Sequence, residues 1–294
     1  MDDFKTLLRN RLATSAASPS LRLSEGGVAT AAAGLDLPLY RDLELGESVD
    51  LYTAVLFLDI RGFTRLSMAL HVVETARILN AVLGAAADRL RAYGAHINDF
   101  PGDGIMAVFT EQDTGEPLEI HAQALFGASH LMAELNATLR DELLQVGIKD
   151  PVQVAIGLYS GGVRWQRIGI EDCSRLMAVG EVAPLAAKFA TSTITTAWQT
   201  MIGGPIAADV PTEMKERQND FIREYDGEEL RRHRWLLNTE ALASRIPDLD
   251  AARRIGATAR SERAPKPPAS LLLGTVAPAM PRHGSGARRD RGVG

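Results

Sequence analysis

Two aspartates occupy positions in the sequence from which a metal-dependent phosphoryl transfer could be carried out. Asp59 follows the apolar, β-favouring run of residues 53–58, and Asp103 lies in the turn-forming segment Pro101-Gly102-Asp103-Gly104. If the hairpin that contains Asp103 pairs with the first strand, the two carboxylates meet at one sheet edge, although they are 44 positions apart (103 − 59). Paired carboxylates repel each other unless a cation lies between them, and oxygen ligands suit Mg²⁺ or Mn²⁺ bound with substrate phosphates. The pair therefore predicts a two-metal phosphoryl-transfer site.

The residues after Asp59 could bind phosphate. Gly62 allows the backbone to turn tightly, Thr64 can cap a short helix, and the start of that helix offers free N–H groups to an anion. Each aspartate taken alone is most simply structural, because aspartate is common at strand ends and in turns. The combination with the flanking residues is what favours a functional site.

Hydrophobic periodicity predicts the elements that must position these residues. Strands are expected over residues 53–58, 95–100, 105–109, 152–159, 162–168 and 175–179, with a turn at Ser160-Gly161. Helices are expected over residues 118–144, from Gly180 to near Ala190, and along the stripe Val73, Ala76, Leu79, Val82, Leu83 and Ala86, with Gly94 as its C-cap. The order β-α-α-β-β-α-β-β-β-α predicts an α+β fold.

The rest of the chain divides by composition. We expect an N-terminal extension over residues 1–50, a catalytic domain over 51–200, a C-terminal extension over 201–257 that packs on it, and a disordered basic tail over 258–294. Phe4, Leu7, Leu8 and Leu12 predict a short amphipathic helix, which an Ala/Gly/Ser-rich connector over residues 13–34 follows.

Composition excludes several classes of function. With 294 residues, 46% hydrophobic, 23% charged and a net charge of −5, the chain is typical of globular proteins and atypical of general nucleic-acid binders. We expect no membrane span and no signal peptide, and the lone Cys173 fits a reducing cytoplasm. The histidines lack zinc-site spacing, and His71, His96, His121 and His130 are interpreted as surface or capping groups.

Three segments resemble the class III nucleotide cyclases. Residues 55–67 (VLFLDIRGFTRLS) resemble their first metal motif, residues 100–109 (FPGDGIMAVF) the second, and residues 156–163 (IGLYSGGV), with Ile168-Gly169, their glycine-punctuated hairpin. The resemblance covers residues 53–192. It implies a ferredoxin-like α+β palm, with a central, mostly antiparallel sheet flanked by helices, that forms a head-to-tail homodimer with sites built from both subunits. The implied reaction is attack of the 3′-hydroxyl of a nucleoside triphosphate on its α-phosphate, with loss of pyrophosphate.

The resemblance also implies roles for single residues. Two divalent cations, Mn²⁺ or Mg²⁺, would be held by Asp59, Ile60 and Asp103, and catalysis would depend on Asp59, Asp103 and Lys188. The implied substrate-binding residues are Arg61, Gly62, Phe63, Thr64, Asp99, Gly102 and Met177.

Four positions depart from the pattern of the purine cyclases. Asp99 and Met177 stand where that family reads adenine with a lysine and with an aspartate or threonine. Pro184 replaces the transition-state asparagine, and Lys188 replaces an arginine, which keeps the charge but loses the bidentate fork. Another group must then do the work of the asparagine, and the candidates are Arg164, Arg167 and Arg175.

The departures predict which base is read. A carboxylate at position 99 accepts where a lysine would donate, so it repels N1 of adenine and suits uracil N3–H, the cytosine amine, or guanine. This combination resembles the pyrimidine cyclases of bacterial anti-phage defence (the Pycsar type), which implies that UTP, or less favourably CTP, is cyclised to a second messenger. A separate cyclic-nucleotide-binding effector would read the product, with no direct nucleic-acid or membrane partner.

Two alternatives stay open. The chain could be a guanylate or other purine cyclase, because an acidic reader also suits guanine. It could instead be a degenerate cyclase domain that only binds nucleotide or dimerises, which the loss at Pro184 favours and the presence of both Asp59 and Asp103 disfavours.

Overall fold

Strand β1 (Ser48–Arg61) lies inside an eight-stranded sheet of the order β2-β3-β1-β4-β6-β10-β7, with β5 paired to β4 alone. The computed structural model describes residues 3–17, 37, 42–110, 116–149, 152–170, 173–192 and 199–263. The strands are β2 (His96–Asp99), β3 (Gly104–Thr110), β4 (Gln153–Ile170), β5 (Cys173–Val179), β6 (Gln199–Gly203), β7 (Lys215–Arg217) and β10 (Arg234–Leu237). Only the β4–β6 pair is parallel among the described strands, and β8 (Phe221–Tyr225) and β9 (Glu228–Arg232) form a separate hairpin. The expected mostly antiparallel α+β sheet is confirmed.

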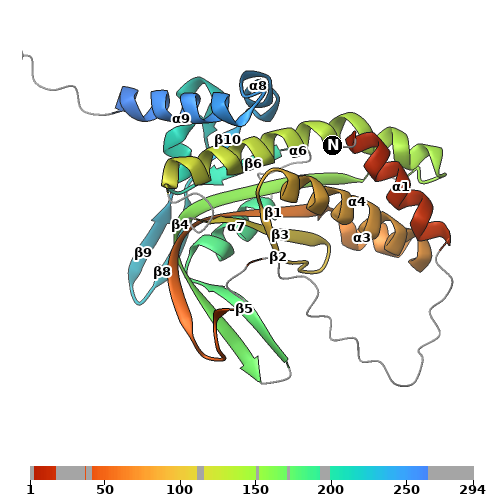
Figure 1. Cartoon of the computed structure of the whole chain (residues 1–294), viewed down its shortest axis with the longest axis horizontal. Helices are drawn as coiled ribbons and strands as arrows, with labels where there is room; N and C mark the ends of the chain where they lie inside the picture. Colours follow the sequence, from red (N-terminus) through yellow and green to blue (C-terminus); the bar gives the residue numbers. More distant parts are fainter. Residues whose placement is uncertain are drawn as a thin grey trace, which may run out of the picture. The chain divides into compact units, whose positions relative to one another are not determined.

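Helices cover both faces of this sheet (Figure 1). One face carries α1 (Phe4–Ala17), α4 (Val72–Ala92) and α6 (Pro117–Gln145), packed on alternate β1 side chains such as Leu56 and Leu58. The other face carries α7 (Val182–Ala190), packed with Val55, Tyr159 and Trp165. Helix α7 lies so close to β4 that a Cβ on Gly157 would be 2.0 Å from the Ala186 carbonyl oxygen, so only glycine fits there.

The remaining helices are short or C-terminal. They are α3 (Phe63–Ala69), α8 (Thr239–Arg245), α9 (Leu249–Arg263) and two 3₁₀ turns, η1 (Pro205–Asp209) and η2 (Thr212–Met214). Within the described ranges, no helix combines the length and the apolar character that crossing a lipid bilayer would require.

The central elements differ from the sequence prediction in three ways. Strand β1 continues through Asp59 to Arg61, and one strand, β4, replaces the two expected over 152–159 and 162–168. The expected turn at Ser160-Gly161 is wrong, because these residues pair with Ala54 and Thr53 and the long β1 strand keeps them extended. Thr64 does not cap α3, whose N-cap is Gly62 in the left-handed conformation (φ 68°).

Helix α4 is confirmed, and the predicted stripe is buried only in part. Val73 and Ala76 at its start are exposed, whereas Val82, Leu83 and Ala86 are buried. His71 caps this helix as expected, since its side chain accepts a hydrogen bond from the Val73 N–H.

The terminal regions also extend further than expected. Helix α1 runs to Ala17 and so includes the first five residues (13–17) of the expected connector, and α9 runs to Arg263, so residues 258–263 are helical rather than part of a tail. Residues 18–34 of the expected connector and residues 264–294 of the expected basic tail lie outside the described residues. Strands β6, β10 and β7 continue the central sheet, so three strands of the expected C-terminal extension are joined to it by hydrogen bonds.

A buried polar network connects α9 to β1. His121, expected at the surface, is 1% exposed; its Nε2 lies 2.9 Å from the Tyr52 hydroxyl and its Nδ1 lies 2.6 Å from Asp209. Arg260 of α9 donates from Nη2 to Asp209 Oδ2 at 2.6 Å. Burial tends to raise the pKa of the Asp209 carboxyl, but hydrogen bonds from His121 and Arg260 outweigh it and hold that pKa below its usual range.

We expect Arg260→Met to lower the free energy of unfolding by about 1.5–3 kcal/mol at neutral pH, because it removes a charged donor from a buried carboxylate. Asp209 has a depressed folded pKa, so its contribution is present above the ordinary carboxyl pKa and is lost as the pH falls through the folded pKa. In urea denaturation, the difference in the free energy of unfolding between the unmodified chain and Arg260→Met should therefore be smaller in acid than at pH 7. Arg254→Met, at an exposed position of the same helix, is the matched control; an equal loss in both variants would contradict the role of the network.

Candidate active site

The structure brings Asp59 and Asp103 together at the end of β1. In the sheet register Asp59 is opposite Gly104, which follows Asp103, and the Ile60 N–H donates to the Asp103 carbonyl oxygen at 3.3 Å. Burial and then the negative charge of Asp103 raise the pKa of Asp59 to about 6, although Arg61, 3.7 Å away, lowers it. The predicted meeting of the two carboxylates is thus observed, with Asp59 inside a strand rather than after it.

This pair has the donor chemistry of a divalent cation site. Partial burial and the charge of Asp103 raise the pKa of Asp59 by more than Arg61 lowers it, so a cation would stabilise the ionised carboxylates. Both side chains offer oxygen ligands, which Mg²⁺ and Mn²⁺ prefer. Among the described residues, no group of three or more His, Cys, Asp or Glu side chains could hold a metal. Ile60 can contribute only backbone atoms. The residues present fit the expected cations.

The close approach of β3 to β1 depends on Gly104. A Cβ at this position would lie 2.6 Å from the Leu58 carbonyl oxygen, which is backbone and cannot rotate away. Gly102 in the preceding turn has a positive φ of 65° and open space around it. The turn that carries Asp103 can therefore lie against β1 because position 104 has no side chain.

Gly104→Ala is expected to cost about 1–3 kcal/mol of folding stability, as overpacking does, because β3 must move away from β1. The same movement separates Asp59 from Asp103, so divalent-cation binding should weaken as well. Calorimetric titration with Mn²⁺, together with thermal denaturation, measures both effects. Gly162→Ala, at a β4 position where an added Cβ would meet no atom within 4 Å, is the control that should change neither.

Arg61, a predicted substrate-binding residue, forms hydrogen bonds within the chain. Its Nη1 and Nη2 donate to the carbonyl oxygens of Ala190 and Ser192, both at 3.0 Å. The guanidinium thus joins the end of β1 to the C-terminal end of α7. Beside it, Gly62 turns the chain into α3, with Phe63 packed against the core and Thr64 exposed.

The predicted base-reading residues lie on β2 and β5. Asp99 accepts the Phe100 N–H at 2.8 Å through Oδ1, and its Oδ2 forms an ion pair with Arg175 Nη1 at 3.2 Å. Met177, two residues after Arg175 on β5, is 43% exposed. A carboxylate acceptor and a guanidinium donor therefore stand side by side next to an apolar side chain.

Lys188 and Pro184 are exposed on one face of α7, four residues apart, while Leu185, Ala186 and Phe189 face the core. Two of the arginines proposed to replace the lost asparagine are engaged elsewhere. Arg164 forms two 2.7 Å hydrogen bonds with Asp50, and Arg167 donates to Ser174 and to the Leu43 carbonyl oxygen.

An open pocket of about 440 Å³ surrounds Lys188, lined also by Thr191, Ser192, Asp220, Phe221, Ile222, Arg223 and Arg234. Arg223 lies over the Phe221 ring, 4.6 Å from its centroid, and Arg234 is 8% exposed. Arg234 donates to the Asn219 carbonyl oxygen at 2.6 Å and to Ser192 Oγ at 3.3 Å. Burial lowers the pKa of Arg234, so a bound anion would stabilise its charged form.

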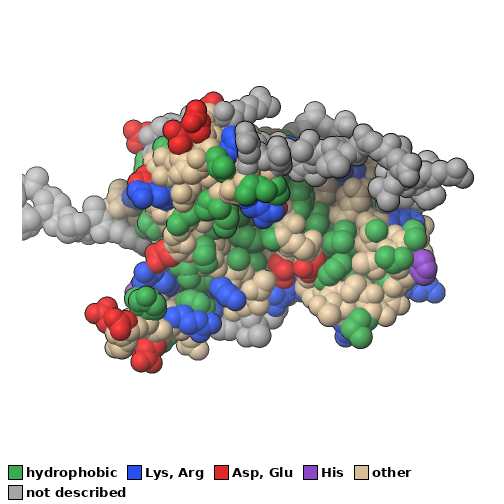
Figure 2. Space-filling model, turned by 90° about the horizontal axis from the view of Figure 1, so that it is seen from below, with side chains coloured by type: hydrophobic (Ala, Val, Ile, Leu, Met, Phe, Trp, Pro, Cys, Tyr) green, Lys and Arg blue, Asp and Glu red, His purple; other side chains and the backbone are tan. Residues whose placement is uncertain are grey.

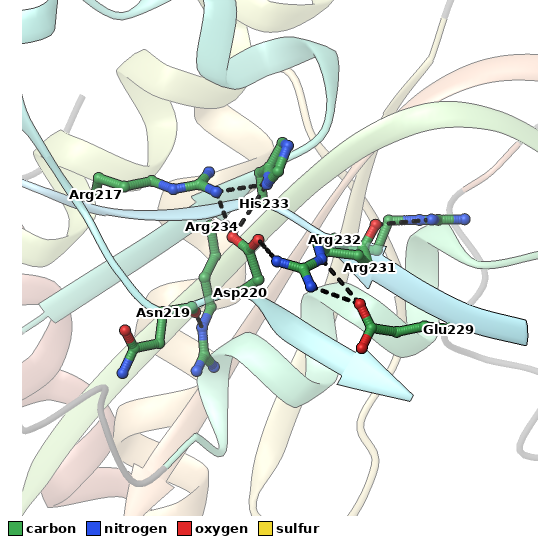
Figure 3. Close-up of polar contacts among 8 residues, drawn as sticks. All are labelled: Arg217, Asn219, Asp220, Glu229, Arg231, Arg232, His233 and Arg234. Carbon is green, nitrogen blue, oxygen red and sulfur yellow. Dashed lines mark hydrogen bonds and ion pairs between the residues drawn. The ribbon is translucent and has the colours of Figure 1, made fainter. Parts of the chain in front are cut away.

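The carboxylate in this pocket is already neutralised. Asp220 is contacted by Arg217, by Arg231 at 3.3 Å and by His233 at 3.0 Å, as Figure 3 shows. The positive charges of Lys188, Arg223 and Arg234 therefore dominate the pocket, which suits an anion. Its described lining residues include neither Asp59 nor Asp103. The lower surface in Figure 2 shows acidic side chains among hydrophobic ones, with Lys and Arg side chains on several sides.

The sequence analysis missed Arg223 and Arg234. The density of arginine in residues 231–234 was a signal for Arg234 alone, and composition does not distinguish it from a solvated strand.

Comparison with known proteins identifies cyclases. A cytidylate cyclase from Staphylococcus aureus is 26% identical over 196 residues, which cover 65% of this chain and 44% of that protein. A uridylate cyclase from Rhodovulum sp. (strain MB263) is 24% identical (53% of this chain, 65% of that protein), and an adenylate cyclase from Anabaena cylindrica is 26% identical (50% and 28%). Each match spans less than two thirds of the relative's own length. No protein-family model matches the chain.

The likeness to solved structures shows the fold. The crystal structure of an adenylyl cyclase from P. aeruginosa has a TM-score of 0.56 and 21% identity, covering 65% of this chain and 95% of that chain. The chain thus has the fold of the class III nucleotide cyclases and resembles, in sequence, cyclases named for pyrimidine nucleotides.

Proposed function

We propose that this chain is a nucleotide cyclase that converts a pyrimidine nucleoside triphosphate, with UTP favoured over CTP, into the 3′,5′-cyclic nucleotide and pyrophosphate. The observation that carries the proposal is the Asp59–Asp103 pair, two repelling carboxylates held together at one end of β1 and β3 in a cyclase fold. A bond forms between the 3′-oxygen and the α-phosphorus. The bond between the α-phosphorus and the oxygen that bridges it to the β-phosphate breaks. Pyrophosphate leaves with the electron pair, and the hydroxyl proton passes to solvent.

The carboxylates would hold two divalent cations, Mn²⁺ or Mg²⁺, which supply charge stabilisation at the α-phosphate and its attacking and leaving oxygens. Ile60 would add backbone contacts. Gly62, Phe63 and Thr64 would place backbone N–H groups near the phosphates, and Gly102 keeps the turn that carries Asp103 free of a side chain.

Lys188 would act on the phosphates from the opposite side. In the pocket around it, Arg223 and Arg234 provide additional positive charge, and we assign to these two arginines the charge stabilisation that Pro184 cannot supply. Because the pocket is lined by neither carboxylate, the proposal includes a head-to-tail homodimer in which Lys188 of one protomer completes the site of its partner.

The base would be read by Asp99 and Arg175. Uracil presents N3–H as a donor between two carbonyl acceptors, so Asp99 accepts from N3–H and needs a neighbouring donor for one carbonyl. Arg175, 3.2 Å from Asp99, is such a donor. Cytosine could give its amine to Asp99, whereas adenine would present the N1 acceptor to a carboxylate that also accepts. Met177 adds an apolar wall beside the pair.

Competition among ATP, GTP, UTP and CTP at equal concentration with Mn²⁺, with products identified by mass, tests the proposal. We expect cyclic UMP as the main product and cyclic CMP as the second. Cyclic AMP as the main product would overturn the role given to Asp99, and cyclic GMP would favour a purine cyclase. If none of the four triphosphates is cyclised, the remaining alternative is a nucleotide-binding or dimerisation module.

The proposed product also suggests a role in the cell. A cyclic pyrimidine nucleotide would act as a second messenger in the cytoplasm, in defence against viruses, and a separate cyclic-nucleotide-binding effector would recognise it. The support is the sequence similarity to proteins named cytidylate and uridylate cyclase. Loss of phage resistance in cells that carry the Asp103→Ala chain would test this role.

A further inference from the structure

Asn98 sits at an irregularity of the edge strand β2. Ile97 pairs with Ala107 and Asp99 pairs with Met106, so the register shifts between them and leaves Asn98 as an extra residue. Such bulges redirect side chains and are frequent beside active sites. Asn98 Nδ2 lies 3.6 Å from Met106 Sδ, and Asp99 is the cross-strand partner of the same methionine. Asn98 and Asp99 therefore both lie beside Met106, on the face of the sheet opposite α4 and α6.

The amide of Asn98 is poorly satisfied within the chain. The residue is 5% exposed, and among the described residues no donor reaches its Oδ1. Its Nδ2 meets the Met106 thioether, which is a weak acceptor. Half a turn about χ2 exchanges Oδ1 and Nδ2 at little cost, because neither atom has a strong partner to lose. A buried amide in this condition is suited to a polar ligand.

The two proposed base-reading residues, Asp99 and Arg175, cannot by themselves distinguish uracil from guanine. Uracil offers N3–H beside the O4 carbonyl, and guanine offers N1–H beside the O6 carbonyl, so Asp99 and Arg175 can bind both in the same way. The bases differ at the next position of the edge, where uracil has the O2 acceptor and guanine has an amine donor. Cytosine also has the O2 acceptor.

We propose that Asn98 is the third base-reading residue, whose Nδ2–H group donates to the O2 carbonyl of a pyrimidine and so selects UTP and CTP against GTP. This inference rests on the proposed function, because it takes Asp99 and Arg175 to face the base. It assigns to Asn98 a specificity role that requires no contact with the reacting phosphate.

Asn98→Asp and Asn98→Leu are the informative variants, measured through the dissociation constants of UTP, CTP and GTP in Mg²⁺. Asn98→Asp keeps acceptors only, so the GTP-over-UTP preference should rise about 5- to 150-fold. Asn98→Leu should weaken UTP and CTP alike and leave their ratio unchanged. Asn80→Leu, at an exposed position of α4, should leave all three constants unchanged.

A substrate analogue tests the same contact without any substitution. In 2-thio-UTP a sulfur, a weak acceptor, replaces O2, so the unmodified chain should bind it less tightly than UTP, and Asn98→Leu should not distinguish the two. An unchanged GTP-over-UTP preference in Asn98→Asp, or equal binding of UTP and 2-thio-UTP by the unmodified chain, would overturn the inference. These readouts do not need turnover, so they are separate from failure of the cyclase activity itself.

Discussion

Asp59→Ala and Asp103→Ala should each lower the cyclase turnover number on the order of 10³-fold or more, because the single remaining carboxylate cannot hold two divalent cations at the α-phosphate. Both changes leave the hydrophobic faces of β1 and β3 intact, so the fold should persist. The folded chain raises the pKa of Asp59 to about 6, so at pH 7 the carboxylate is still largely ionised, but its charge costs more free energy there than in the unfolded chain. In the absence of metal, the melting temperature of Asp59→Asn should therefore stay the same or rise.

The combination of lost activity with preserved or increased stability separates a metal-binding role from a structural one. If a carboxylate only ended a strand or formed a turn, its removal would lower the stability of the chain. It would leave the metal dependence of the cyclase activity unchanged. Asp141→Ala, at an exposed position of α6, is the control that should alter neither activity nor stability. Full activity of Asp103→Ala with intact metal dependence would refute the assignment.

The sequence predicted best what local patterns and a specific motif determine. The meeting of Asp59 and Asp103 was predicted on the condition that the hairpin pairs with the buried run, and the helices at 117–145 and 182–190 followed from their periodicity. The predicted turn at Ser160-Gly161 was wrong because two small residues look like a break in isolation. What keeps them extended is the length of β1, whose residues 100 or more positions earlier form the ladder with them.

Long-range partners explain the other differences. Arg260 belonged by composition to a basic tail, yet a buried acceptor, Asp209, makes it part of a helix-anchoring network. Arg61 belonged to a motif that we expected to bind substrate, and the end of α7 supplies the carbonyl oxygens to which it donates. The bulge at Asn98 has no sequence signature, because it depends on the register between β2 and β3. A charged or amide side chain can be identified from sequence, but its partner comes from the tertiary fold.

Mixing inactive Asp59→Ala chains with inactive Lys188→Ala chains should restore cyclase activity. In a head-to-tail dimer each site takes its carboxylates from one protomer and its lysine from the other. A mixed dimer then has one site with both changes and one site with neither. Random exchange in an equimolar mixture gives mixed dimers half of the time, so about a quarter of the unmodified activity should return.

The matched control is a mixture of Asp59→Ala with Asp103→Ala. Both carboxylates come from the same protomer, as their adjacency at the end of β1 requires, so every site in that mixture lacks one of them and no activity should return. Co-purification through a tag on one chain establishes that mixed dimers form in both experiments. Recovery in the first mixture and not in the second would assign Lys188 to the partner's site. Mixed dimers without recovery in the first mixture would mean that each protomer carries its own lysine, and the pocket around Lys188 would then have to serve the carboxylates of the same chain.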